Sequence, residues 1–325
     1  MVDIPEKHDF CIYCFDFNDQ GQAKDAKESG SSDDSELTWW HLDALNPETE
    51  SFLRENIGLP EIIVEALLEE DTRPRLEEFD HGRLIILRGV NTMNKDRPDD
   101  MISLRIWVDD GRIITMRRRF LRSIQDMAEK LKTGHQIKSP GDILNAVIDR
   151  LLSYTSPVIE KIQDRCDELE EAVIDEPDKS LRKEITKLRK QAITMRRYLS
   201  PQRDVLTQLR ADEFKGFTTP NRREFQEQAN FLLRLVEDLD MLRERTQIVQ
   251  DELTTALADA LNRNMYLLSV IAAIFLPLGF LTGLLGINVG GIPGADNGQA
   301  FWYFCGGLAI LILLQVLWFK KAKWF

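Results

Sequence analysis

The chain has 325 residues, enough for a soluble domain with a sizeable core and further segments, and it carries a net charge of −12. Nucleic acid is a poor partner for so acidic a chain, whereas cations are concentrated near it. The sequence contains no phosphate-cradling Gly-rich loop, no nucleophile motif and no convincing cluster of metal ligands, which argues against an enzyme.

Residues 1–140 predict an α/β domain, because strand patterns are interrupted by helical ones. The strand candidates are residues 10–17, 37–45, 83–90, 102–110 and 112–119, of which the last two form a hairpin. Helices are expected to begin near Pro47 and to cover residues 60–70. Residues 18–36 are rich in Gly, Ser and Asp, which indicates a surface loop or local disorder.

Cys11 and Cys14 form a Cys-x-x-Cys pair inside the first strand candidate. Residues three apart on a regular strand point to opposite faces, so the pair is expected to be structural and not to share a metal ion. The four cysteines give no disulfide framework in a cytoplasmic domain. The four histidines are scattered without ligand spacing and are interpreted as ordinary surface or core residues.

Helical periodicity begins at Gly141 and predicts a helical and stalk region over residues 141–263. Pro157 is expected to bend the first helix of this region. A second amphipathic segment runs from residue 180 to about residue 213, and Pro201 is expected to interrupt it.

A third helix is expected to begin after Thr219-Pro220, where Thr can cap and Pro suits the first turn. No helix breaker appears between Asn221 and Leu276. If the helix continues to Gly286, it is roughly 100 Å long at about 1.5 Å per residue. The first membrane span would then be the end of a stalk that starts in the cytoplasm.

Residues 264–325 predict a transmembrane hairpin with spans at about 265–287 and 300–319. Both stretches are uncharged, and a helix of about 20 such residues crosses a bilayer core. Arg263 precedes the first span, lysines follow the second, and no signal peptide opens the chain. Basic flanks stay in the cytoplasm, so both termini are expected there. The part up to Arg263 carries −14, because the charges after it sum to +2.

Two spans per chain cannot enclose a water-filled path, so transport would require several copies around an axis. A face of small or mildly polar residues follows the third helix into the membrane: Asp251, Ala258, Asn262, Met265, Ser269, Ala272, Leu276, Gly279 and Gly283. This face could line a central path, but small residues also serve ordinary helix contacts in lipid. The sequence pattern alone leaves both interpretations open.

The first span closes with Gly286, Ile287 and Asn288. Asparagine at a helix end is often only a cap. Repeated around a symmetry axis, its amide would instead give a ring of carbonyl acceptors that holds a cation through its water shell.

This Gly-Ile-Asn tripeptide, between a Pro-containing span and a second span, resembles the CorA superfamily of divalent-cation transporters. Ile287 departs from the Gly-Met-Asn of the magnesium branch and is similar to the zinc-transporter branch, the ZntB proteins. Further stretches resemble that branch: Thr72-Arg73-Pro74-Arg75, Met195-Arg196-Arg197-Tyr198, Pro201-Gln202-Arg203-Asp204 and Gly290-Gly291-Ile292-Pro293-Gly294. The resemblance covers essentially the whole chain.

The resemblance implies a funnel-shaped homopentamer in a bacterial inner membrane that moves Zn²⁺, possibly coupled to protons, and holds no cofactor. It places the lining of the pore at Asp251, Asn262, Met265, Leu268, Ala272, Leu276, Gly279 and Asn288, of which Asn288, and with less support Asp251, would hold the ion. Gly279 stands where the magnesium branch usually has a hydroxyl residue, which argues against magnesium-type selectivity. The alternatives are a CorA-type Mg²⁺ or broad divalent-cation channel and, in another class, a membrane-anchored scaffold or sensor.

Overall fold

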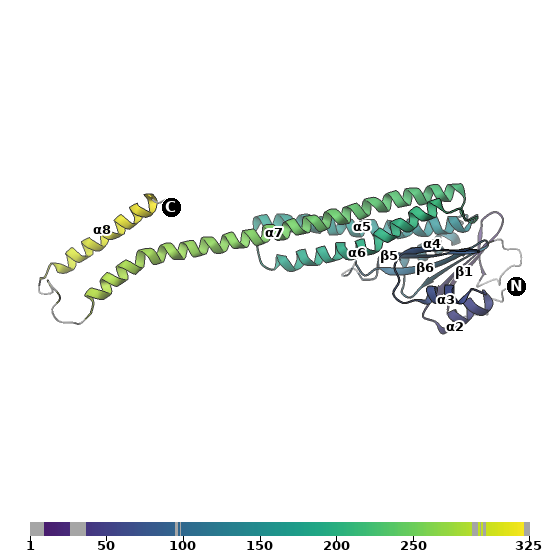
Figure 1. Cartoon of the computed structure of the whole chain (residues 1–325), viewed down its shortest axis with the longest axis horizontal. Coiled ribbons are helices and arrows are strands. Elements are labelled where there is room, and N and C mark those ends of the chain that lie inside the picture. The colour runs from purple at the N-terminus through teal and green to yellow at the C-terminus, as the bar shows by residue number, and fades with distance from the viewer. Residues whose placement is uncertain are drawn as a thin grey trace. The chain divides into compact units, whose positions relative to one another are not determined.

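The structure is a computed structural model that describes residues 10–26, 37–94, 97, 99–287, 292, 294 and 297–321. The chain divides into two units, one up to Glu252 and one from Leu253 onward. The long helix α7 (Thr219–Leu285) belongs to both units and is traced in green in Figure 1.

A seven-stranded mixed sheet organises the first unit, with the strand order β2-β1-β3-β7-β6-β5-β4. Its strands are β1 (Cys11–Phe17), β2 (Ala23–Asp25), β3 (Leu37–Asp43), β4 (Arg75–Phe79), β5 (Gly82–Gly89), β6 (Ile102–Asp109) and β7 (Arg112–Arg117). β3 and β7 are parallel neighbours, and every other neighbouring pair is antiparallel. All five predicted strands are therefore confirmed, including the β6–β7 hairpin.

Two strands escaped prediction, and β2 lies within the stretch expected to be a loop. Its three residues carry no apolar alternation, and only their pairing with β1 makes them a strand. The turn before it is built by Asn18, whose Oδ1 accepts hydrogen bonds from the backbone N–H groups of Gln20 and Gln22 at 3.1 and 2.9 Å. Residues 27–36 of the expected loop lie outside the described residues.

Helices cover both faces of the sheet (Figure 1). On one face lie α2 (Pro47–Ser51), the π-helical turn η1 (Phe52–Asn56) and α3 (Glu61–Leu68). Their apolar side chains share a buried core with Trp40, Leu42 and Trp107 of the strands. The other face carries α4 (Arg122–Lys132), α5 (Pro140–Asp175) and α6 (Leu181–Ala211). The predicted helices near Pro47 and over residues 60–70 are confirmed, while α4 was not predicted.

Cys11 and Cys14 contradict the expectation that they point to opposite faces. The pairing register of β1 shifts between Cys11 and Tyr13, and this irregularity places both thiols in one buried core cluster. A hydrogen bond with Cys11 raises the pKa of the Cys14 thiol, and burial raises it by a smaller amount. Both cysteines are free thiols, and a protonated thiol is a poor metal ligand.

Two prolines lie inside long helices without ending them. α5 continues through Pro157, and α6 continues through Pro201, so the expected interruption at Pro201 is wrong. Proline removes one backbone hydrogen bond, but α6 buries Leu199, Gln202 and Val205 around this point. Tertiary packing offsets the local cost, and the Oε1 of Gln202 also accepts a 2.6 Å hydrogen bond from the backbone N–H of Arg88.

The stalk helix α7 confirms the predicted length, because it runs unbroken for 67 residues from Thr219 to Leu285. Its N-terminus is capped differently from the expectation. The hydroxyl of Thr218, and not that of Thr219, accepts the N–H of Asn221 at 3.4 Å. The Asn221 side chain returns the contact by accepting from the N–H of Thr218 at 2.9 Å.

His41 makes the stability of the first unit sensitive to acid. Burial in the sheet, together with the charge of Arg117, lowers its pKa from 6.5 to about 3. Between pH 6.5 and pH 3, His41 is protonated in the unfolded chain but stays neutral in the folded chain. The free energy of unfolding therefore falls as the pH falls. We expect a loss on the order of 3 kcal/mol at pH 4 relative to neutral pH.

Unfolding midpoints measured between pH 7 and 4 check this expectation. The variant His41→Asn cannot titrate, yet its amide can still meet the Thr115 hydroxyl that lies 2.9 Å from Nδ1 of His41. Its pH dependence should be flatter than that of the natural protein. Equal acid sensitivity in the two proteins would show that His41 is not the cause.

Candidate ion-conducting site

The second unit contains two helices that are long and apolar enough to cross a membrane. They are the C-terminal part of α7 and α8 (Ala300–Lys321). The apolar windows of these helices are almost entirely unburied by the chain itself, at 6% and 0% of their residues. This distinguishes them from core helices of a soluble protein, since those bury their apolar side chains.

The predicted lining residues that the structure describes lie on one face of α7. At about 3.6 residues per turn, they fall within roughly one third of the helix circumference. Met265, Leu268 and Leu276 are 59%, 67% and 73% exposed. Asn262, Ala272 and Gly279 are exposed as well. The face is therefore continuous along the span and is not covered within the chain.

The second span packs on the opposite face of α7. The better covered residues there are Val270, Ala273, Ile274, Pro277, Leu278 and Leu281. A side-chain amide of α8 marks the contact, because Nε2 of Gln315 donates to the carbonyl of Ala273 at 3.4 Å. The two faces of α7 thus have different roles: one packs on α8, and the other faces away from it.

Within the described part of the chain, no neighbouring element explains the glycines of the uncovered face. A methyl group added at Gly279 or Gly283 would meet no described atom within 4 Å beyond the helix's own backbone. An ordinary contact between the two spans of one chain therefore does not explain these small residues. What remains is a contact with another molecule or the wall of a central path.

The outer end of α7 is built by Gly286. Its N–H donates to the carbonyls of Thr282 and Gly283 at 2.9 and 3.2 Å, which tightens the last turn as the helix ends at Leu285. Ile287 follows and is exposed. Asn288 lies outside the described residues, as do Gly290, Gly291 and Pro293 of the connector. The expected ring of amides therefore stays a prediction.

The acidic end of the predicted path lies near Asp251, whose Oδ1 accepts a 2.8 Å hydrogen bond from Nε2 of Gln247. Within the described ranges, no group of three or more His, Cys, Asp or Glu side chains is placed to hold a metal ion. Tight zinc sites use such groups.

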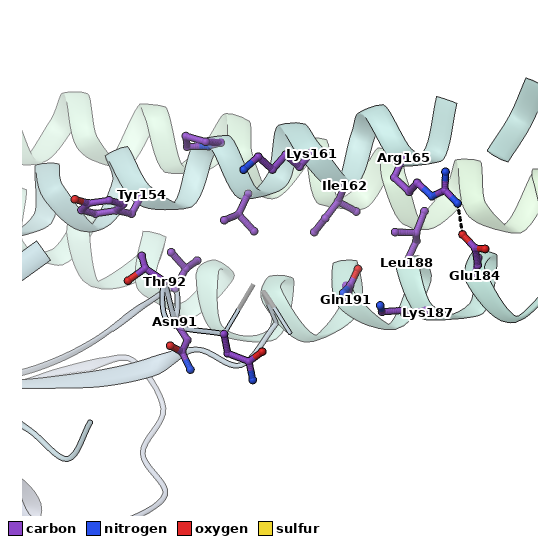
Figure 2. Close-up of a pocket in the computed structure, with 14 residues that line it drawn as sticks. Asn91, Thr92, Tyr154, Lys161, Ile162, Arg165, Glu184, Lys187, Leu188 and Gln191 are labelled. Carbon is purple, nitrogen blue, oxygen red and sulfur yellow. Dashed lines mark hydrogen bonds and ion pairs between the residues drawn. The ribbon is translucent and has the colours of Figure 1, made fainter. Parts of the chain in front are cut away.

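A cavity of about 610 Å³ in the first unit lies between α5, α6 and the loop after β5 (Figure 2). Its lining combines apolar side chains such as Ile162 and Leu188 with the cations Lys161, Arg165 and Lys187. Its acid, Glu184, is paired with Arg165, as the dashed line in Figure 2 shows. A cavity with this charge repels divalent cations. This cavity was not predicted, because its lining residues lie far apart along the chain.

An α/β domain, a long helix and two candidate spans, the first with an uncovered face of small residues, are features of a membrane transport protein. The sequence matches the family described as "CorA-like Mg2+ transporter protein" over residues 34–321. The chain belongs to this family, which confirms the expected fold class of an α/β domain, a long helix and two membrane helices.

Named relatives extend over nearly the full chain. The "Zinc transport protein ZntB" of Yersinia enterocolitica is 34% identical over 313 residues, which are 96% of this chain and 95% of that protein. The "Divalent cation transporter CmaX" of Pseudomonas aeruginosa is 37% identical over 291 residues, or 89% of this chain and 88% of that protein. With the two candidate spans, this kinship to transporters makes the chain a membrane protein.

Solved structures agree with the fold. Full-length CmaX superposes with a TM-score of 0.83 at 35% identity and covers 98% of this chain and 100% of its own. The CorA magnesium transporter of Methanocaldococcus jannaschii reaches a TM-score of 0.82 at 21% identity, covering 97% of this chain and 99% of its own, and supports the fold alone.

Proposed function

We propose that this protein transports zinc ions across the bacterial inner membrane through a pore lined by the uncovered face of α7. The observation that carries the proposal is the division of α7 into two faces, with α8 packed on one and the predicted lining positions on the other. Relatives named as zinc transport proteins over nearly the full chain support zinc as the ion.

A homopentamer would give this face its function. Five copies of α7 would turn Asn262, Met265, Ala272, Leu276 and Gly279 toward one axis, as the family resemblance implies. The absence of a Cβ contact at Gly279 leaves room for such a neighbour. The mass of the purified protein in lipid tests the assembly, and a monomer there would leave no conduit.

Ion passage would begin at Gly286, Ile287 and Asn288. The Asn288 amides would accept hydrogen bonds from the water shell of the ion, so the ion enters without losing that shell. Small divalent ions dehydrate reluctantly, so weak contacts through water permit both entry and exit. The acidic first unit, with Asp251 near the inner end of the path, would concentrate cations on the cytoplasmic side.

Both termini would be cytoplasmic, because basic residues flank the inner ends of the spans. Arg263 precedes the first span, and Lys320 and Lys321 end α8, while Lys323 lies outside the described residues. Basic flanks are retained on the cytoplasmic side of the bacterial inner membrane.

Zinc uptake into vesicles of defined orientation tests the function. We expect the purified protein to admit radiolabelled Zn²⁺ faster than Mg²⁺ when the two ions are supplied side by side, because Gly279 offers no hydroxyl ring. Equal uptake rates of the two ions would favour the second candidate, a broad divalent-cation channel. The similarity to CmaX supports this candidate. No uptake of either ion would favour a membrane-anchored scaffold.

Proton coupling is a separate part of the proposal. The first span contains no carboxylate, histidine or basic side chain after Arg263, so coupling would involve Asp251, Glu252 or Asp259, or water bound to the ion. Zinc uptake measured with and without an inward proton gradient checks this. Uptake indifferent to the gradient would rule coupling out and leave a passive channel.

A further inference from the structure

A second, more polar cavity of about 460 Å³ lies in the first unit, where β5 and β6 meet α6. Its lining includes five arginines, Arg88, Arg97, Arg118, Arg119 and Arg197, together with the acids Glu70, Asp99 and Asp100. The formal charge of the lining is therefore +2, in a part of the chain whose total charge is −14.

Three stretches that the transport path does not use converge on this cavity. From residues 72–75, the carbonyl of Thr72 accepts a hydrogen bond from Arg88. From residues 195–198, Arg197 and Tyr198 form one wall. From residues 201–204, Gln202 fixes the backbone N–H of Arg88. Segments far apart along the chain thus meet around one residue, Arg88.

The side chain of Tyr198 holds two of the arginines in place. The guanidinium carbons of Arg88 and Arg197 lie 4.5 and 4.8 Å from the centre of its ring. Nη2 of Arg197 also donates to the tyrosine hydroxyl at 2.8 Å. Stacking of this kind fixes the plane of a guanidinium before any ligand arrives.

Carboxylates leave much of this positive charge unbalanced. Arg119 is fully paired, since it donates to both oxygens of Asp100 at 2.9 and 3.0 Å. Among the carboxylates of the described chain, Arg88 reaches only the exposed Asp71 at 3.6 Å, and Arg118 reaches only the exposed Glu70 at 3.9 Å. Their other contacts are uncharged, since Arg88 donates to the carbonyls of Met101 and Thr72 and Arg118 donates to the carbonyl of Leu68.

Of the five arginines, only Arg88, Arg118 and Arg119 have a carboxylate of the described chain within ion-pair distance, and Arg97 and Arg197 have none. The side chain of Arg197 contacts Tyr198 and is exposed. Four of the five arginines therefore have a distant carboxylate or none.

Buried nitrogen atoms beside the cavity lack hydrogen-bond partners. Nε of Arg88 and Nε of Arg118 are buried and unpaired in the described structure. Arg105 is fully buried behind them, with Nε and Nη1 unpaired. Burial, together with the charges of Arg118 and Arg88, lowers the pKa of Arg105 to about 10. The cluster is under mutual repulsion that an anion would relieve.

We propose that this arginine-lined cavity binds a soluble phosphate-bearing anion between Arg88, Arg118 and Arg197. The guanidinium fork matches the oxygen geometry of phosphate, and several forks around one cavity favour a polyanion such as pyrophosphate over chloride. Cavities of roughly 300–1,000 Å³ commonly hold small ligands. The cavity lies wholly in the unit up to Glu252, and the uncharged stretches of both candidate spans lie after that unit. We therefore expect a soluble anion and not a lipid headgroup.

Equilibrium dialysis of radiolabelled pyrophosphate against the full-length protein in dodecyl maltoside tests the proposal. EDTA removes metal ions that would bind pyrophosphate, and sodium chloride keeps the ionic strength equal in all samples. We expect saturable binding of one pyrophosphate per chain, with weaker binding of inorganic phosphate. Arg197→Gln should weaken the affinity by about tenfold or more, because it removes one charge-assisted pair of hydrogen bonds.

Two further variants separate recognition from general electrostatics. Arg197→Lys keeps the charge but not the fork, so it should lie between the natural protein and Arg197→Gln. Arg182→Gln removes an exposed arginine from the same helix outside the cavity and should leave binding unchanged. Absence of saturable binding, equal weakening by Arg182→Gln, or full displacement by chloride at constant ionic strength would each overturn the proposal. Both arginine positions are exposed, so the variants are expected to fold.

Discussion

Replacing Asn288 by alanine is expected to abolish zinc entry while leaving the assembly intact. The amide carbonyls at this position are the proposed acceptors for the water shell of the ion, and alanine offers none. Without them the ion must give up water at the mouth, which small divalent ions resist. We expect radiolabelled zinc uptake into vesicles to fall to background, with an unchanged particle mass in detergent.

A matched control lies in the same connector. Asn297 is an asparagine outside the Gly-Ile-Asn tripeptide, and its Oδ1 accepts the N–H of Gln299 at 3.0 Å, which is a local turn contact. Asn297→Ala should therefore transport zinc at nearly the natural rate. Normal uptake by Asn288→Ala would remove this residue from the proposed site, and loss of uptake in both variants would point to the connector as a whole.

Asp212→Ala is expected to destabilise the first unit by about 3 kcal/mol or more, because it leaves the buried Arg83 guanidinium with only the exposed and more distant Glu78, at 3.7 Å, as an ion-pair partner. The carboxylate of Asp212 binds Arg83 through Nε and Nη2 at 2.6 and 2.9 Å, and the two side chains are only 2% and 12% exposed. The hydrogen bond with Asp212 raises the pKa of Arg83, so this arginine stays charged. The pair joins β5 to the end of α6.

The thermal midpoint of the first unit, followed by the fluorescence of the sheet tryptophans, measures this loss. Asp204→Ala is the matched control, because Asp204 pairs with Arg203 on the same helix while 55% exposed. Exposed pairs contribute about 0–1 kcal/mol, so the control should change the midpoint little. A midpoint for Asp212→Ala no lower than that of Asp204→Ala would show that the pair does not anchor the helix.

Replacing both partners separates the bond from the cost of an orphaned charge. In a double variant with Arg83→Leu and Asp212→Leu, no buried charge is left without a partner. We expect it to be more stable than Asp212→Ala alone, since apolar side chains can replace a buried ion pair at little cost. If the double variant is as unstable as Asp212→Ala, lost packing and not the orphaned charge explains the loss of stability.

Elements with strong local periodicity were predictable, and elements defined by partners were not. The sheet strands β5, β6 and β7 are rich in apolar side chains, and their prediction is confirmed. β2 is three residues long with two charged side chains, and only its hydrogen bonds to β1 make it a strand. At Pro201 a local signal predicted a break that the structure does not have. The apolar face that α6 buries stabilises the helix through this proline.

The candidate site divides in the same way. The lining positions on α7 follow from spacing along one helix, so sequence and resemblance could name them. That α8 covers the other face is a contact between residues about forty apart, such as Ala273 and Gln315. The arginine cavity was equally hidden, because it gathers Arg88, Arg118 and Arg197 from three separate elements.

The sequence by itself determined that the chain ends in two membrane spans, that a long helix leads into the first of them, and that the residues resemble a family of divalent-cation transporters. These features are encoded locally, in runs of uncharged residues, helical periodicity and short motifs. Only the tertiary structure decided which face of α7 is uncovered, that a register shift in β1 buries Cys11 and Cys14 together, and that arginines surround a cavity in an acidic chain. Such properties depend on residues distant in sequence, whose contacts form only when the chain folds.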